Sequence, residues 1–271
     1  MKHKKVTRVA IIGAAGRMGQ ALVRCARNMP EIQVVGAVER GEHATVGRDA
    51  GQVASVGEIG VTVTSDLADA ARGADVLIDF SLHTTVAAHA RLACELGRSL
   101  VVGTTGLYGT EKAVLKEVSK KIAVVSAPNM SAGMGVLFAL VNTASAALGP
   151  RYDVEIIDFH HRHKKDAPSG TALHLAERIA AGRGQDIHEV ASYGRKGIAE
   201  GRPEGQIGIH AVRAGDIVGD HTVVFAIDGE RLEFTHRATS RDAYAIGALR
   251  AAQWVKGRKP GLYSMQDVLG L

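Results

Sequence analysis

Short apolar runs alternate with segments of helical spacing through the first half of the chain. Val6–Ile12 is a compact apolar run that ends at a glycine, which is typical of a buried parallel strand. Arg17–Asn28 follows with apolar side chains at helical spacing and stops just before Pro30. The alternation continues and predicts strands at Gln33–Val38, Val61–Thr64, Ala74–Phe80, Leu100–Val102 and Ile122–Val125, with helices at Thr84–Leu96 and Thr110–Lys120.

This alternation is typical of βαβ units, because neighbouring parallel strands need a crossover connection and a helix usually supplies it. We therefore predict an α/β protein in which residues 1–130 form a Rossmann-like domain. Its core is expected to be a doubly wound parallel sheet with helices on both faces.

The pattern changes after residue 130. Asp153–Phe159 alternates polar and apolar residues, as a strand with one buried face does. The pair Asp228 and Gly229 is a hairpin signal between two later strands. The prediction for this half comprises helices at Ser131–Leu148 and Ser169–Ala181, an irregular stretch over roughly Gly182–Gly208, and strands at Gly208–Arg213, His221–Ile227 and Arg231–His236.

Residues 131–240 are therefore expected to form a smaller α+β domain. Its sheet should be open and mixed, with antiparallel pairing predominating. The last predicted helix, Arg241–Val255, is amphipathic. We expect this helix, and with it residues 241–271, to return to the first domain.

Composition narrows the classes of function. Of the 271 residues 46% are hydrophobic, which is enough to form two hydrophobic cores. Only 4% are aromatic, so few side chains are available to stack on nucleic-acid bases. The net charge of +5 suits an anionic small ligand at least as well as nucleic acid. No apolar stretch approaches 18 residues, and the first apolar run breaks too early for a signal peptide. We expect a cytoplasmic protein with neither a membrane nor a nucleic-acid partner.

Cysteine usage adds little chemistry. Cys25 and Cys94 each lie in a helical, apolar context, and neither belongs to a zinc-ligand spacing or a disulfide framework. We expect both to be buried, reduced thiols.

A glycine-rich turn separates the first predicted strand from the first helix. In VAIIGAAGRMG, Gly13, Gly16 and Gly19 follow the pattern G-x-x-G-x-x-G. Glycine lets the backbone turn tightly and approach a pyrophosphate, and the helix that follows offers free N–H groups. The alternative is that these glycines serve only the packing of helix on sheet.

Two charged residues end the second strand and strengthen the dinucleotide interpretation. Glu39 is placed to accept hydrogen bonds from a ribose, as in NAD recognition, and Arg40 to pair with a 2′-phosphate, as in NADP recognition. Together they suggest that the protein accepts either cofactor.

Later strand ends supply further candidates, because ligands bind at the carboxyl ends of parallel strands. Gly103, Thr104 and Thr105 follow one strand and are candidates for contacting a nicotinamide ribose or carboxamide. A turn with a helix cap explains them equally well. Ala127–Met130 follows another strand, at the expected boundary between the domains.

The segment HHRHKKDAPSGT at residues 160–171 concentrates cationic and protonatable groups. A metal site on His160, His161 and His163 is disfavoured, because adjacent strand residues point to opposite sides and the lysines would repel a cation. Nucleic-acid binding lacks any motif. A solvated basic turn explains the charges but not the helix-start signal behind them.

That signal resembles an anion site. Ser169 is a suitable N-cap, and Gly170 and Thr171 would present N–H groups at the positive end of the helix dipole. A dicarboxylate would place one carboxylate there and the other near His161 and Lys164. We expect the surrounding cations to ease proton donation by a histidine and a lysine of this segment.

In order along the chain, GAAGRMG, VER, DFS, GTTG, SAPNMSAGMG and HHRHKKDAPSGTAL resemble the 4-hydroxy-tetrahydrodipicolinate reductase (dihydrodipicolinate reductase) family of the lysine–diaminopimelate pathway. The resemblance covers nearly the whole chain, and the HHRHK…D-x-P-S-G-T segment is its most specific part. It implies a Rossmann-like domain, a smaller domain whose open sheet assembles a homotetramer, NADPH or NADH as hydride donor, and a cyclic dicarboxylate substrate.

The resemblance also implies roles for individual residues. His160 and Lys164 would be the proton-donating pair, while His161, Gly170 and Thr171 would bind the substrate. His163 and Lys165 receive no role. The residues implied to line the cofactor are Gly13, Ala14, Ala15, Gly16, Arg17, Met18, Glu39, Arg40, Gly103, Thr104, Thr105, Ala127, Pro128, Asn129 and Met130.

Two rival functions share the predicted fold. A nicotinamide-dependent semialdehyde dehydrogenase that acylates needs a nucleophilic cysteine, and neither Cys25 nor Cys94 lies at a strand end. A nucleotide sensor without catalysis would keep the glycine turn but would not need His160 or Lys164.

Overall fold

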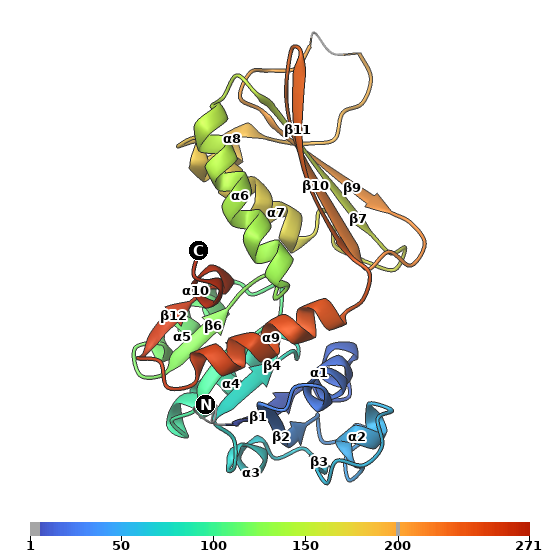
Figure 1. Ribbon diagram of the computed structural model, residues 1–271, viewed down its shortest axis with the longest axis vertical. Coiled ribbons are helices and arrows are strands. Elements are labelled where there is room, and N and C mark those ends of the chain that lie inside the picture. Colours follow the sequence, from blue (N-terminus) through green and yellow to red (C-terminus); the bar gives the residue numbers. More distant parts are fainter. Residues whose placement is uncertain (1–5, 199–200) are drawn as a thin grey trace. The chain divides into compact units, whose positions relative to one another are not determined.

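The computed structural model describes residues 6–198 and 201–271, and these residues divide into two compact units. The first unit comprises the chain up to Ala132 together with Arg241–Leu271, and the second unit comprises Gly133–Ser240. Figure 1 shows the elements of each unit.

The first unit is built on a sheet of seven strands in the order β12-β6-β5-β4-β1-β2-β3, and all of the pairings are parallel. Read from β3 to β6, this is the 3-2-1-4-5-6 order of a doubly wound dinucleotide-binding sheet. The strands are β1 (Thr7–Ile12), β2 (Ile32–Val38), β3 (Val63–Thr64), β4 (Val76–Asp79), β5 (Ser99–Val102), β6 (Ala123–Ser126) and β12 (Gly261–Tyr263).

Helices cover both faces of this sheet because alternate strand residues point in opposite directions. In β1, Val9 and Ile11 pack into one apolar core, and Ala10 and Ile12 pack into the other. The first core also contains residues of α1 (Arg17–Arg27), α2 (Ala50–Val53), α9 (Asp242–Val255) and α10 (Met265–Leu269), and the second those of α3 (Leu67–Ala71), α4 (His83–Glu95) and α5 (Gly109–Val118).

The C-terminal segment is an integral part of the first unit. Gly247 of α9 lies so close to the carbonyl oxygen of Met130 that a Cβ there would be 1.8 Å from it. Lys256 Nζ donates to the carbonyl of Val6 and to Asp75 Oδ2, each over 2.8 Å. β12 and α10 extend the returning segment beyond the single helix that the periodicity predicts.

The second unit carries a sheet of five strands in the order β11-β10-β7-β9-β8. Three helices, α6 (Ala132–Leu148), α7 (Gly170–Gly182) and α8 (Ile187–Val190), accompany it. α6 and α7 pack on one face around a core that includes Phe138, Leu175, Ile156 and Phe225. The strands are β7 (Asp153–His160), β8 (Ala191–Tyr193), β9 (Ile207–Arg213), β10 (Gly219–Ile227) and β11 (Glu230–Ala238).

The sheet is mixed, as expected: β10 pairs antiparallel with β7 and β11, and β9 pairs parallel with β7 and β8. One expectation for this unit is wrong, because the stretch at 182–208 is not irregular throughout but contains α8 and β8. α8 is only four residues long and is capped by Asp186, while β8 depends on pairing with β9, so neither has a periodic signal of its own.

Among the described helices, none is both long enough and apolar enough to cross a membrane.

Candidate functional site

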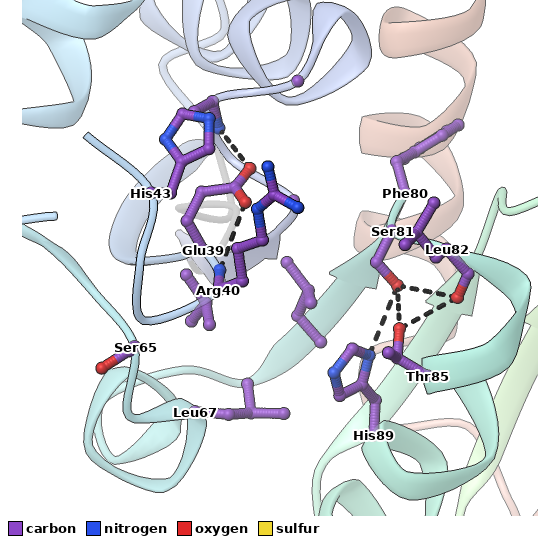
Figure 2. A pocket seen from close by; sticks show the side chains of 15 residues that line it. Glu39, Arg40, His43, Ser65, Leu67, Phe80, Ser81, Leu82, Thr85 and His89 are labelled. Atoms are coloured by element: carbon purple, nitrogen blue, oxygen red, sulfur yellow. Dashed lines mark hydrogen bonds between the residues drawn. The ribbon is translucent and has the colours of Figure 1, made fainter. Parts of the chain in front are cut away.

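A cavity of about 560 Å³ opens at the carboxyl ends of β1, β2 and β4 in the first unit. This volume is typical of small-molecule and cofactor sites. Figure 2 shows Glu39, Arg40 and His43 on one side of it and Ser81, Thr85 and His89 on the other. The lining residues are Ile12, Gly13, Ala15, Gly16, Val38, Glu39, Arg40, His43, Ser65, Leu67, Phe80, Ser81, Leu82, Thr85 and His89.

Steric constraints explain the glycines of the turn. Gly13 has φ +80°, and a Cβ there would lie 2.7 Å from the carbonyl oxygen of Phe80. A Cβ at Gly19 would lie 2.2 Å from the carbonyl oxygen of Gly13. Gly16 is the N-cap of α1 and has no side chain to cap the helix. The turn therefore packs tightly and also exposes backbone at a helix N-terminus beside the cavity.

Glu39 joins the end of β2 to this turn. Its Oε1 accepts a hydrogen bond of 3.0 Å from the backbone N–H of Ala15, and its Oε2 accepts one of 3.3 Å from the N–H of Arg40. The carboxylate is thus held at the wall of the cavity beside the glycine turn.

His43 and Ser65 also line the cavity, and the sequence analysis missed both. His43 Nδ1 lies 2.8 Å from Thr45 Oγ1 and accepts a hydrogen bond of 3.3 Å from the Thr45 N–H. Because both residues lie in irregular segments after strands, no periodicity marks them.

A polar network centred on Asp79 lies below the other wall. Asp79 is fully buried, and its Oδ2 is 2.8 Å from His89 Nδ1. Its Oδ1 accepts from the Ser81 hydroxyl over 2.6 Å and from the Thr104 hydroxyl over 3.2 Å. These contacts fix Ser81 and His89 at the cavity wall.

Several residues that the resemblance implies for the cofactor do not line the cavity. A Cβ at Gly103 would lie 2.1 Å from the ring of Phe80, so the glycine makes room for that ring. Thr104 is buried and donates to Asp79. The other expected residues outside the lining are Ala14, Arg17, Met18, Thr105, Ala127, Pro128, Asn129 and Met130; of these, Ala14, Ala127 and Met130 belong to the core and Met18 packs against it.

The second unit contains the cationic segment. β7 extends to His160, whose neighbours along the strand are alternately buried and half-exposed. His160 is 8% exposed, and His161 begins the loop that leads to α7. His163 and Lys165 are exposed.

Carboxylates lie beside both expected proton donors, which the sequence analysis did not foresee. Asp158 Oδ1 is 3.0 Å from His160 Nδ1, and Asp166 Oδ1 is 2.9 Å from Lys164 Nζ. The cations that the sequence places around the two donors are therefore accompanied by carboxylates. Burial opposes ionisation of Asp166, but the ion pair with Lys164 holds the pKa of that carboxyl below its usual range.

Asp158 is the most enclosed charge of this region and is fully buried. Burial alone would raise its pKa. The contacts of its carboxylate with His160, His221 and Ser169 overcome that penalty and hold the pKa of Asp158 well below the ordinary value. The group is therefore an anion at neutral pH.

The start of α7 agrees with the predicted cap. Ser169 is the N-cap, and its Oγ accepts a hydrogen bond of 3.2 Å from the Ala172 N–H. Gly170 and Thr171 are the first two helical residues, and Gly170 is exposed. A Cβ at Gly170 would meet nothing within 4 Å, so there is open space at this helix end.

Asp158, His160 and His221 place three possible metal-ligand atoms within 4.8 Å of one another. This group differs from the three adjacent histidines considered above. Both oxygens of Asp158 already accept hydrogen bonds, and Arg213 Nη2 lies 3.1 Å from Oδ2. A cation there would compete with a guanidinium, so we assign no metal.

The thiols have no place in either site. Cys25 is buried, and burial raises its pKa to about 11, so it is a poor nucleophile at neutral pH. Cys94 is half-buried rather than buried as expected, and both cysteines are free of disulfides.

An all-parallel sheet in this strand order, with a glycine turn and an acidic residue beside a cavity at the strand ends, is the architecture of a Rossmann-type dinucleotide-binding protein. The chain belongs to the dihydrodipicolinate reductase family: residues 7–130 match the model for the N-terminus of that family, and residues 133–269 match the model for its C-terminus.

Similar proteins of known name support this family assignment. The chain is 49% identical to the 4-hydroxy-tetrahydrodipicolinate reductase of Anaeromyxobacter dehalogenans (strain 2CP-C), with 98% of each chain covered. It is also 49% identical to that of Alkalilimnicola ehrlichii, with 98% of this chain and 99% of the relative covered.

A solved structure is similar over the whole chain. It is the dipicolinate-bound dihydrodipicolinate reductase from Paenisporosarcina sp. TG-14, with a TM-score of 0.74, 25% identity, and coverage of 97% of this chain and 99% of that one. The predicted family and fold class are confirmed. So is the expected activity, an oxidoreductase acting on 4-hydroxy-tetrahydrodipicolinate in lysine biosynthesis.

Proposed function

We propose that the two units divide the reduction between them. Residues of the first unit bind NADPH or NADH, and residues of the second unit bind and protonate the cyclic dicarboxylate. Two observations carry the proposal. The first unit has a cavity of cofactor size at the strand ends. In the second unit, His160 is buried against the carboxylate of Asp158, close to the exposed N-terminus of α7.

The residues of the first unit fit a dinucleotide. The turn at Gly13–Gly16 lets a pyrophosphate approach the backbone and the N-terminus of α1. Glu39 is held where it can accept from a ribose, and Arg40 beside it can pair with a 2′-phosphate. A bound nicotinamide cofactor supplies the hydride.

The residues of the second unit fit an anionic substrate. Gly170 and Thr171 offer backbone N–H groups at the start of α7, and one substrate carboxylate binds there. Lys164 provides positive charge for the other carboxylate, and His161 binds it beside Lys164. This assignment follows the resemblance residue by residue, and the dipicolinate-bound relative supports the class of ligand.

His160 and Lys164 move protons in the proposed reaction. Loss of the 4-hydroxyl as water gives a conjugated imine, hydride addition at C4 follows, and one proton completes tetrahydrodipicolinate. His160 faces Asp158 through Nδ1, which leaves Nε2 for the substrate. Lys164 is half-buried beside Asp166. Orientation and charge are the contributions of this chain.

We further propose that the protein is a cytoplasmic homotetramer. The face of the second sheet that points away from α6 and α7 carries half-buried apolar residues, Ile157 and Phe159 among them. A second copy of the chain would cover such a face.

The test is an assay of NADPH oxidation with freshly made 4-hydroxy-tetrahydrodipicolinate, accompanied by a titration of NADPH binding. The wild-type protein is expected to turn over. Binding of NADPH without any turnover would favour the nucleotide sensor instead. Light scattering coupled to size exclusion checks the tetramer, and a monomer would contradict it.

A further inference from the structure

The buried face of β7 contains a carboxylate where its neighbours are apolar. Val154, Ile156, Asp158 and His160 alternate along the strand and are all buried. A carboxylate in such a row is unfavourable unless donors surround it. Asp158 therefore needs a reason to be there, and its surroundings supply one.

Donors converge on Asp158 from three other elements. At the start of α7, Ser169 donates its N–H to Oδ2 over 2.9 Å and its hydroxyl to Oδ1 over 2.7 Å. From β9, Arg213 Nη2 lies 3.1 Å from Oδ2. From β10, His221 Nε2 lies 3.2 Å from Oδ1. Only a buried anion satisfies all of these groups together.

The same carboxylate faces the proposed proton donor. His160 Nδ1 lies 3.0 Å from Oδ1, close enough for a proton on Nδ1 to face the carboxylate, although the ring is turned away from the ideal hydrogen-bond direction. The rings of His160 and His221 meet edge to face, with centroids 5.3 Å apart. His160 is thus confined between Asp158 and His221.

Arg213 connects Asp158 to the loop between β7 and α7. Its Nη1 donates to the carbonyl of Asp158 over 3.1 Å, and its Nη2 donates to the carbonyl of Asp166 over 2.7 Å. Asp166 in turn pairs with Lys164. Both proposed proton donors and the helix cap are therefore connected to one buried anion.

We infer that Asp158 is a positioning residue for the reaction: it holds His160 with the proton on Nδ1, and through Ser169 it holds the N-terminus of α7 at a fixed place relative to His160. The inference rests on the proposed function, because Asp158 is inferred to position His160, the proton donor proposed there, and the N-terminus of α7, the proposed carboxylate site. A carboxylate that orients an imidazole and fixes its tautomer is a recurrent device in enzymes.

The first test needs no substitution of Asp158. Nitrogen-15 NMR of the wild-type protein, with the His160 signal assigned by its absence in His160→Gln, reports which ring nitrogen carries the proton in the neutral form. The inference expects Nδ1. A neutral His160 protonated only on Nε2 would overturn it, because a bare Nδ1 would then face the carboxylate.

The second test uses kinetics. Asp158→Asn keeps the shape and removes the charge, and kcat is expected to fall about 10–100-fold while KM for the substrate rises. Asp158→Glu restores the charge and should recover most of kcat. Ser169→Ala disturbs the helix cap and should raise KM more than it lowers kcat. His163→Gln changes an exposed neighbour without a role and serves as the control.

The outcomes distinguish a failure of the role inferred for Asp158 from a failure of the proposed role of His160. If wild type is active and His160→Gln is impaired, but Asp158→Asn keeps kcat within about twofold, the inference alone is wrong. If His160→Gln is unimpaired, the proposed role of His160 fails and the inference fails with it. Melting temperature and NADPH affinity show whether Asp158→Asn is folded, and the NMR result decides the inference if it is not.

Discussion

The two candidate sites are built in different ways. In the first unit the glycine turn brings backbone to the cavity wall: Gly13 and Gly19 permit close packing of the turn, and Gly16 leaves a helix end uncapped by a side chain. In the second unit the site is a set of charged side chains ordered by the buried carboxylate of Asp158. The first kind of site depends on steric space, and the second depends on charge placed in a low-dielectric environment. Substitutions should therefore fail in different ways in the two units.

The largest effect is expected from the proton donor. His160→Gln should lower kcat by about 10²–10⁴-fold, because general acid catalysis typically contributes that much. NADPH affinity should stay near the wild-type value, since the residue belongs to the second unit. Steady-state kinetics and a binding titration measure both, with His163→Gln as the exposed control. An unchanged kcat would remove His160 from the mechanism.

A substitution that causes a steric clash in the glycine turn should affect stability, and also cofactor binding, which His160→Gln is expected to leave unchanged. Gly19→Ala places a Cβ about 2.2 Å from the carbonyl oxygen of Gly13, which forces the turn to shift. We expect a loss of about 1–3 kcal/mol in the free energy of unfolding and weaker binding of both NADPH and NADH. Gly109→Ala is the matched control, because a Cβ there meets nothing within 4 Å. Equal behaviour of the two variants in denaturation and binding experiments would contradict the steric account.

Arg40 offers a finer test within the first site. Arg40→Ala should weaken NADPH binding by about tenfold, which is about 1.4 kcal/mol, and should change NADH binding much less. Fluorescence titration with each cofactor measures the difference, and Arg72→Ala, an exposed arginine outside the cavity, controls for net charge. Equal losses for both cofactors would argue against a 2′-phosphate contact.

The smallest effect concerns charge placement away from both sites. Burial of Glu155 opposes its ionisation, but hydrogen bonds from Arg195, His210 and Arg202 lower its pKa from 4.5 to about 2. The ionised carboxylate therefore stabilises the fold above pH 4.5, and this contribution is lost as the pH falls from 4.5 to about 2. Partial exposure limits it to about 1 kcal/mol. Thermal melting across this range should show a shallower pH dependence for Glu155→Gln, whereas the exposed Glu95→Gln should follow wild type.

The comparison also explains what the sequence reveals. The turn from Gly13 to Gly19 is contiguous, and it lies between a strand and a helix whose periods are visible, so both the parallel sheet and the cofactor cavity were predictable. The cap at Ser169 was predictable for the same reason. Each of these features is formed by residues close together in the sequence, so the local sequence pattern predicts it.

The support around Asp158 was not predictable. Arg213 is 55 residues away along the chain, and His221 comes from another strand, so only the folded sheet brings them together. The parallel pairing of β7 with β9 was missed on similar grounds, because alternation of polarity predicts a strand but not its direction. His43 likewise joins the cavity from an irregular segment.

The most direct measurement of the division between the units is a crystal structure with NADPH and dipicolinate bound together. The account predicts the pyrophosphate at the turn of Gly13–Gly16, and one dipicolinate carboxylate on the N–H groups of Gly170 and Thr171 with His160 Nε2 facing the ring. A pyrophosphate elsewhere, or a dipicolinate that touches neither α7 nor His160, would contradict it.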